Sequence, residues 1–425
     1  MRQGKMLSFP SVLLLGINGI IGSGVFLLPS TLYKQAGVWS LLAIVIAGLG
    51  TTIIALNYAH LAAQIDADGG AWVYAARAFG DFSGFMTGWI AWFLGVITIA
   101  AEVAAFLTTL GGLWAPAKDR GVYTILALGI IGILGVLNLF GPQLLQIADN
   151  LASGFKIGII AVFVIGGAFA IGSRHLHLQG AGTLNGGSLL AACVTAFYMF
   201  TGFSFLPTAA HDMRNPNKVL PKALLLIMAG CTALYAAVHA VTLTLLGSGV
   251  ATTKLPVARA FAEIWGETGR ALVLSGMLVS ILGVALAVAF AAPVGVAALA
   301  NDHHLLPAPF GHVNKDGAPT VAILLTTVCA ALLVVSGGYL FLVQLIVLCS
   351  FLQYIGTAMA ALRLTPKTEK PLRRLGVPVV SCALAVAILT QFTLRSYMIT
   401  LAVGAFGCLV YYWDWRRNKR HNLNG

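Results

Sequence analysis

The chain has 425 residues, of which 59% are hydrophobic and only 9% are charged, with a net charge of +12 at pH 7. A soluble domain averages about 25% charged residues, so the composition excludes an ordinary soluble protein and indicates a polytopic membrane protein. The Lys and Arg residues are dispersed among short loops, which fits the positive-inside rule and excludes nucleic acid as a partner.

Long stretches without Asp, Glu, Lys or Arg recur along the chain. A membrane helix needs about 20 mostly apolar residues, so these stretches predict an all-α protein with twelve transmembrane helices. The helices are expected near residues 9–32, 39–63, 82–112, 121–141, 150–172, 187–209, 222–247, 270–300, 318–336, 339–363, 375–392 and 396–413. An even number of spans places both termini on the same side of the membrane. About two in three of the 25 Lys and Arg residues are expected on that side as well. We therefore expect a multi-pass protein of the cytoplasmic (inner) membrane with both termini in the cytoplasm.

The first predicted helix is interrupted near its middle. Residues Leu15–Pro29 read LGINGIIGSGVFLLP, and the run Gly22-Ser23-Gly24 disfavours a continuous helix, because each interior Gly costs about 1 kcal/mol relative to Ala. Irregular backbone at membrane depth is tolerated only where protein buries it or where it lines a cavity. The interruption therefore predicts a solute site, with a close helix-packing motif of small residues as the alternative.

Two charged residues lie inside predicted spans, Glu102 in the third helix and Lys156 in the fifth. A charge at mid-membrane costs roughly 2.5–3.5 kcal/mol, so such residues usually face a cavity or a partner. Lys156 is a candidate for ion coupling by protons, with a lysine that snorkels to the membrane surface as the alternative. Glu102 is a candidate proton carrier, a cation-binding group of the substrate pocket or a structural partner, and these alternatives stay open.

The sixth predicted helix carries a second interruption, Thr201-Gly202-Phe203-Ser204, followed by Pro207. It lies five spans after the first, and an odd offset gives the two halves opposite orientations. Matching interruptions indicate an inverted repeat with a binding site between the halves. We expect repeats at about 9–172 and 187–363 within a ten-helix transport core (1–363), followed by two additional helices and a basic cytoplasmic tail (364–425).

Each interruption exposes two half-helix ends. N-terminal ends present N–H groups that suit a carboxylate, and C-terminal ends present carbonyls that suit an ammonium group. A zwitterionic amino acid carries both charges. The expected substrate-binding residues are Ile20, Gly22, Ser23, Gly24, Tyr198, Thr201, Gly202 and Ser204, with the N–H groups of Ser23 and Gly24 for the carboxylate and the carbonyls of Ile20, Tyr198 and Thr201 for the ammonium group. Tyr198 and Phe200 are the expected gating residues, and ordinary apolar packing is the alternative for both.

At these residues the chain resembles the amino acid–polyamine–organocation (APC) transporter superfamily. The matching stretches are GINGIIGSGVFLLP in the first helix, DADGGAWVYAARAFG after the second, FYMFTGFSFLPTAAHDMRNPNKVLPKAL across the sixth and ALANDHHLLPAPFGHVNKDGAP after the eighth. The resemblance implies a LeuT-type fold of 5+5 inverted repeats, alternating access and a substrate at the two interruptions. It also implies that Lys156 replaces a sodium ion, whereas Glu102 is not part of the family pattern.

The expected function is therefore secondary active transport of amino acids by alternating access. We expect neutral substrates, and transport that is proton-coupled or an exchange and independent of sodium. The alternatives are a transporter of cationic amino acids or polyamines, selected by Glu102, and a receptor that binds amino acids without moving them. We expect no enzymatic activity, no cofactor and no metal. The expected partners are the amino acid, protons and membrane lipid, with a homodimer left open.

Overall fold

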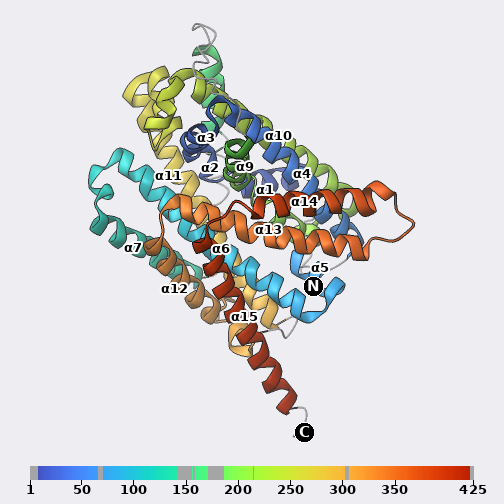
Figure 1. Ribbon diagram of the computed structural model, residues 1–425. Coiled ribbons are helices and arrows are strands. Elements are labelled where there is room, and N and C mark those ends of the chain that lie inside the picture. Colours follow the sequence, from blue (N-terminus) through green and yellow to red (C-terminus); the bar gives the residue numbers. More distant parts are fainter. Residues whose placement is uncertain are drawn as a thin grey trace.

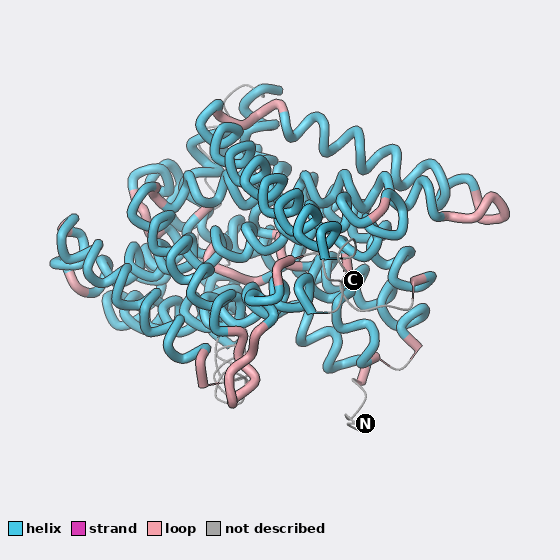
Figure 2. The backbone as a smooth tube through the Cα atoms, turned by 90° about the horizontal axis from the view of Figure 1, so that it is seen from below, coloured by secondary structure: helices cyan, strands magenta, loops and turns pink. Residues whose placement is uncertain are grey.

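The computed structural model describes residues 8–65, 70–140, 156, 158–170, 186–213, 215–301 and 306–421, without the side chains of 208–212, 217 and 417–421. In these ranges the chain consists of helices and connecting loops, and no strand is formed (Figure 1, Figure 2). The α-helices are α1 (Phe9–Ile20), α2 (Gly24–Leu27), α3 (Pro29–Ala36), α4 (Ser40–Gln64), α5 (Ala71–Phe79), α6 (Asp81–Leu113), α7 (Arg120–Asn138), α9 (Gly186–Met199), α10 (Pro216–Leu246), α11 (Pro256–Asn301), α12 (Thr320–Ser336), α13 (Tyr339–Leu364), α14 (Val377–Leu389) and α15 (Leu394–His421). The short 3-10 helices and one π turn are η1 (Gly37–Trp39), η2 (Ala115–Lys118), η3 (Phe203–Asp212), η4 (Gly247–Thr252), η5 (Ala308–Gly311) and η6 (Leu372–Gly376, the π turn). A further apolar helix covers Gly158–Ala170.

In the part of the chain that the structure describes, nine helices are long and apolar enough to cross a membrane. Three shorter apolar helices, α1, Gly158–Ala170 and α12, coincide with the remaining predicted spans. The all-α polytopic fold is thus confirmed, while the count of twelve spans stays a prediction. Residues 150–155, 157 and 171–172 of the fifth predicted helix lie outside the described residues.

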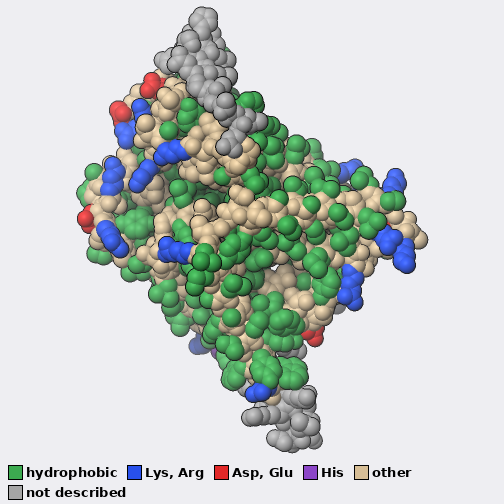
Figure 3. Space-filling model, in the orientation of Figure 1, with side chains coloured by type: hydrophobic (Ala, Val, Ile, Leu, Met, Phe, Trp, Pro, Cys, Tyr) green, Lys and Arg blue, Asp and Glu red, His purple; other side chains and the backbone are tan. Residues whose placement is uncertain are grey.

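The surface agrees with a membrane-embedded body. Figure 3 shows a broad band of hydrophobic side chains, with most Lys and Arg gathered toward the two lateral edges of this view. Large apolar side chains such as Leu394 and Leu401 on α15 are 75% and 70% exposed. Such exposure is costly in water and favourable in lipid, so these positions indicate a lipid-facing surface.

Helix α6 forms the centre of the described structure and packs against α5, α11, α12 and α13. In the most apolar 18-residue stretch of α6, 83% of the residues are buried. The corresponding value for the terminal helix α15 is 17%. Helix α15 projects from the body and carries the C-terminal end of the chain (Figure 1). The central position of α6 is what brings Glu102 into the interior.

Two helical stretches go beyond the predicted spans. Helix α5 is absent from the prediction because nine residues are too few to span a membrane. Helix α11 begins at Pro256 instead of near residue 270, and its added part includes Glu263 and Glu267, which interrupt the apolar run. A kink at Trp265 and Gly266, where Gly266 has a φ of 65°, lies within this added part, between the two glutamates.

Candidate functional site

The predicted break in the first helix is present and extends over residues Ile21–Ser23. Helix α1 ends at Ile20, and Ile21 takes an extended conformation with φ −78° and ψ 100°. The helix resumes as α2 at Gly24, so Gly24 starts the second half-helix and does not belong to the break. The C-terminal end of α1 and the N-terminal end of α2 therefore meet inside the protein.

Lys156 lies at the C-terminal end of α1. Its ammonium group donates hydrogen bonds to the carbonyl of Ile21 at 2.5 Å, to Oδ1 of Asn18 at 3.0 Å and to the carbonyl of Asn18 at 3.4 Å. The residue is only 2% exposed, so it does not snorkel to the surface. Because the C-terminal end of a helix carries a negative partial charge, the ammonium group stabilises the broken end of α1.

Glu102 lies at the other end of the same break. Its Oε1 accepts hydrogen bonds from the hydroxyl of Ser23 at 3.0 Å, from the N–H of Ser23 at 3.4 Å and from the hydroxyl of Tyr198 at 3.1 Å. A Cβ atom at Gly22 would lie 3.0 Å from this oxygen, so the close approach depends on the missing side chain. The carboxylate thus faces the N-terminal end of α2, where the partial charge is positive.

Two tyrosines enclose the side chain of Ser23. The hydroxyl of Tyr339, at the start of α13, is 3.1 Å from Ser23 Oγ, and the hydroxyl of Tyr198 is 3.2 Å from it. The two tyrosine rings pack edge to face, with centroids 6.2 Å apart. This network closes one side of the break and joins α2, α6, α9 and α13.

The predicted break in the sixth helix is also present. Helix α9 ends at Met199 and the chain continues as η3 from Phe203. The N–H of Thr201 and its hydroxyl donate to the carbonyl of Tyr198 at 3.1 and 2.7 Å. Gly202 has a φ of 105°, and a Cβ atom here would clash with the carbonyl oxygen of Gly19. The main chains of the two broken segments therefore touch at a position where only Gly fits.

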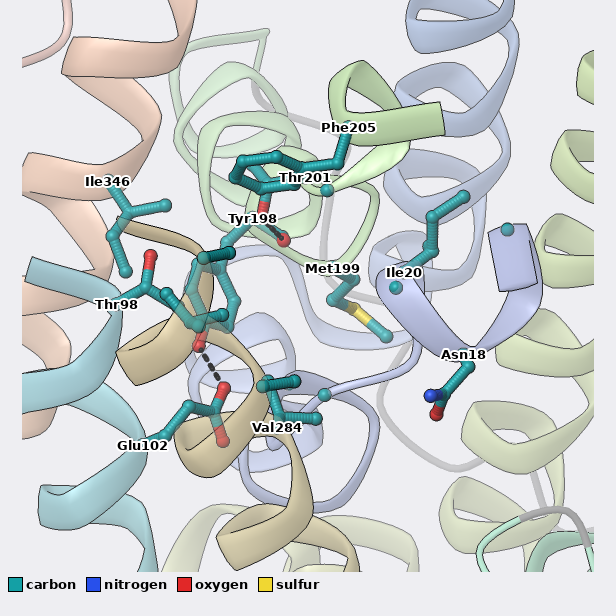
Figure 4. Close-up of a pocket in the computed structure, with 18 of the residues that line it drawn as sticks. Asn18, Ile20, Thr98, Glu102, Tyr198, Met199, Thr201, Phe205, Val284 and Ile346 are labelled. Carbon is teal, nitrogen blue, oxygen red and sulfur yellow. Dashed lines mark hydrogen bonds between the residues drawn. The ribbon is translucent and has the colours of Figure 1, made fainter. Parts of the chain in front are cut away.

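A cavity of about 350 Å³ lies between the two broken segments (Figure 4). This volume is within the range of small-molecule sites, about 300–1,000 Å³. Of the predicted binding residues, Ile20, Gly22, Gly24, Tyr198, Thr201 and Gly202 line the cavity. Ser23 is not among the lining residues, because its side chain is turned to Glu102 and the two tyrosines. Glu102 lines the cavity as well.

A second cavity of about 390 Å³ is lined by Ser204, Gln353 and residues of α5, α6 and α11. Leu94, Phe205 and Ala291 line both cavities, so they form the partition between the two. Phe200, by contrast, is fully buried and packs edge-on against Tyr235, with ring centroids 5.2 Å apart. The structure thus places Ser204 in the second cavity and Phe200 in neither of these two.

Several of the predicted main-chain ligands already have partners. The carbonyl of Ile20 accepts the hydroxyl of Tyr235 at 3.2 Å, and the N–H of Ser23 is directed at Glu102. Among the described residues, the carbonyl of Thr201 and the N–H of Gly24 form no hydrogen bond with the protein. In the described part of the chain, no group of three or more His, Cys, Asp or Glu side chains lies close enough together to hold a metal ion.

Sequence reasoning missed Tyr339 and Phe205 as residues of the site. Tyr339 lies 316 positions from its hydrogen-bond partner Ser23, and no local pattern connects them. Phe205 directly follows the predicted interruption Thr201–Ser204, and this position was the signal available. Both residues enter the site through tertiary packing.

A family model and several known proteins match between half and nearly all of the chain. The family model described as "Amino acid permease" matches residues 7–412. The uncharacterized transporter Rv1979c of Mycobacterium tuberculosis is 30% identical over 84% of this chain and 80% of its own length. In Bacillus subtilis, the methylthioribose transporter is 27% identical over 99% of this chain and 94% of its own length. The branched-chain amino acid permease BcaP of the same organism is 27% identical over 54% of this chain and 52% of its own length.

Proposed function

The chain belongs to the amino acid permease family of the APC superfamily and is a multi-pass membrane transporter, and on this premise we propose that it transports neutral amino acids. The observation that carries the proposal is the cavity of about 350 Å³ between two broken segments. Broken helices at membrane depth are tolerated where they line a cavity, and they mark the binding sites of secondary transporters.

Two main-chain groups support a zwitterionic substrate. Gly24, at the start of α2, and Thr201, in the second break, line the same cavity, and the N–H of Gly24 and the carbonyl of Thr201 form no hydrogen bond with the described protein. The first suits a carboxylate and the second an ammonium group. The remaining wall is largely apolar and includes Leu94, Val284 and Ile346, which favours a neutral, apolar side chain.

Alternating access requires two gates, one on each side of the substrate site. On one side, the contacts of the Ser23 hydroxyl with the hydroxyls of Tyr198 and Tyr339 form the proposed first gate. On the other side, Phe205 separates the two cavities and is the proposed second gate. In the proposed cycle the repeats 9–172 and 187–363 move against each other, while the part 364–425 stays at the edge, in agreement with the exposure of α14 and α15.

The surroundings of Lys156 support transport without sodium. Three oxygens of Asn18 and Ile21 lie within 2.5–3.4 Å of its ammonium group, and carbonyl oxygens at a half-helix end are typical ligands of a coupling ion in transporters. A fixed ammonium group at this place makes a bound cation unnecessary. We therefore propose proton coupling or exchange in a cytoplasmic membrane, with both termini in the cytoplasm.

The proposal is tested by uptake of a radiolabelled amino acid panel into proteoliposomes, with and without a proton gradient and with sodium replaced by choline. We expect flux of neutral amino acids that is unaffected by the removal of sodium. Folded protein that binds amino acids and moves none, in uptake or in exchange, would favour the receptor alternative. Folded protein without binding or flux for any amino acid would contradict the proposal.

A further inference from the structure

We infer that Glu102 is the anchor for the amino group of the substrate, and that the cavity recognises a monoamine with an apolar body whether or not it carries a carboxylate. The inference rests on the proposed function, because it concerns the same cavity. According to this inference, the amino group of the substrate is essential for binding, and its carboxylate contributes less to the affinity.

The two carboxylate oxygens of Glu102 have different surroundings. Oε1 accepts from Ser23 and Tyr198, whereas Oε2 is buried and has no hydrogen-bond partner in the described part of the protein. Glu102 is 2% exposed and lines the cavity. Figure 4 shows Oε1 directed at the hydroxyl of Tyr198 and the other oxygen turned away from it. A buried acceptor without a donor is unfavourable, so a ligand's donor that reaches Oε2 would be stabilised there.

Counting the available hydroxyl protons shows which hydroxyl donates each hydrogen bond around Glu102. Tyr339 donates to Ser23 Oγ, Ser23 donates to Oε1 of Glu102, and Tyr198 also donates to Oε1. Each hydroxyl has one proton and each is then used once. Two of the three hydroxyls thus donate to Oε1 and the third donates to Ser23, so none of them donates to Oε2, which is left as an acceptor for an ammonium group.

Other acceptors near the cavity are less suited to a cation. The carbonyl of Tyr198 accepts two hydrogen bonds from Thr201, and the carbonyl of Ile21 accepts from Lys156. The carbonyl of Thr201 is available but neutral. Among the described residues that line this cavity, Glu102 is the single acidic or basic side chain. A cationic group therefore finds its opposite charge at this residue alone.

The same lining limits what else the ligand can carry. Apart from Glu102, the wall opposite the breaks consists mainly of apolar side chains, among them Leu94, Val284, Val288 and Ile346. A second cationic group would find no opposite charge there, which disfavours polyamines. Of the two N–H groups predicted for a ligand carboxylate, that of Ser23 is directed at Glu102 and that of Gly24 is open, so the carboxylate gains one neutral donor and adds less than the amino group.

A ligand series on the unmodified protein tests this inference. Leucine is compared with 3-methylbutylamine, which lacks the carboxylate, and with 4-methylpentanoate, which lacks the amino group. Direct binding is measured by calorimetry on the purified full chain, so the result does not depend on flux. We expect the amine to bind within about tenfold of leucine and the acid to bind at least about 100-fold more weakly.

A matched pair of variants then tests whether Glu102 is responsible for binding the amino group. Glu102→Gln keeps the shape and one acceptor but removes the charge, and should weaken binding of leucine and of the amine by about 10- to 150-fold. Glu267→Gln, at a side chain 81% exposed on α11, should leave binding unchanged. A size-exclusion profile of each variant shows that it is folded.

Three outcomes would overturn the inference. The first is an acid that binds like leucine while the amine does not, because the cavity would then select the carboxylate. The second is Glu102→Gln with unchanged affinity and an altered pH dependence of flux, which would make Glu102 a proton carrier. The third is a protein that binds none of the three ligands. Binding of the amine without any amino acid flux would support the inference and contradict the proposed transport function instead.

Discussion

The two broken segments provide open main chain beside one cavity, but they are stabilised in different ways. The break between α1 and α2 is stabilised by side chains of opposite charge from other helices, Lys156 at one end and Glu102 at the other. The break between α9 and η3 is stabilised by its own chain, through Thr201 and a φ of 105° at Gly202. The first break is thus controlled by charges that a ligand or a proton can change, whereas the second is controlled by backbone geometry.

The largest effect is expected from a change that breaks the second segment. Gly202→Ala combines a left-handed φ with a clash against the carbonyl of Gly19, and we expect it to abolish transport and lower the yield of folded protein. Gly80→Ala is the matched control, because Gly80 has a φ of 91° and no atom near its missing Cβ. Strain alone costs about 1–3 kcal/mol. Equal melting temperatures and equal flux for the two variants would contradict this account of the second break.

The next effect concerns the charge at the first break. Lys156→Ala removes the ammonium donor from the carbonyls of Ile21 and Asn18, and loss of a charged hydrogen bond costs about 1.5–3 kcal/mol. We expect flux to fall about 10- to 100-fold with normal membrane insertion, measured by proteoliposome uptake and by the amount of protein in the membrane. Lys34→Ala, at an exposed lysine, is the control. Flux at the wild-type level at every pH would show that the first break does not depend on this charge.

A smaller effect is expected where the two segments face each other across the cavity. A Cβ atom at Gly24 would lie 3.1 Å from Tyr198 and Met199, so Gly24→Leu should displace α2 from α9 and weaken amino acid binding about tenfold. Gly129→Leu on α7 is the control, because open space surrounds the missing Cβ of Gly129. Affinity is measured by calorimetry. An unchanged value for Gly24→Leu would remove Gly24 from the site.

The smallest effect is expected at the partition between the cavities. Phe205→Ala should join the two spaces and weaken apparent affinity about threefold, a change of less than about 1 kcal/mol, with little loss of stability because Phe205 is 44% exposed. Phe169→Ala, at a phenylalanine that is 80% exposed, is the control. Competition in the uptake assay measures both. If the two variants behave alike, Phe205 is not a gate.

Much of the fold was predictable because the charge-free runs coincide with helices. The prediction for residues 39–63 agrees with α4 (Ser40–Gln64), and that for 82–112 agrees with α6 (Asp81–Leu113). Helix α5 and the first part of α11 were missed, since they are too short or too charged to span a membrane. The position of the first break was predicted to within one residue, because the glycines that disfavour a helix also allow Glu102 to approach.

The partners within the site were harder to predict. Glu102 and Lys156 were recognised as unusual from the cost of a charge in the membrane, but their places at the two ends of one break depend on how α6 and the fifth predicted span pack against α1 and α2. The contacts of Ser23 with Glu102 and Tyr339 join residues 79 and 316 positions apart. Separations of this size leave no local pattern, so the chemistry of the charged residues was predictable and their pairing was not.

The contact between Gly202 and the carbonyl of Gly19 involves no side chain on either partner. Two main-chain segments that touch without side chains can shift relative to each other without a rotamer change and without breaking a hydrogen bond at the point of contact. This contact therefore adds neither a side-chain rearrangement nor an exchange of hydrogen-bond partners to a relative motion of the two segments. The slow step of a conformational cycle is then expected where hydroxyl groups must exchange partners, around Ser23.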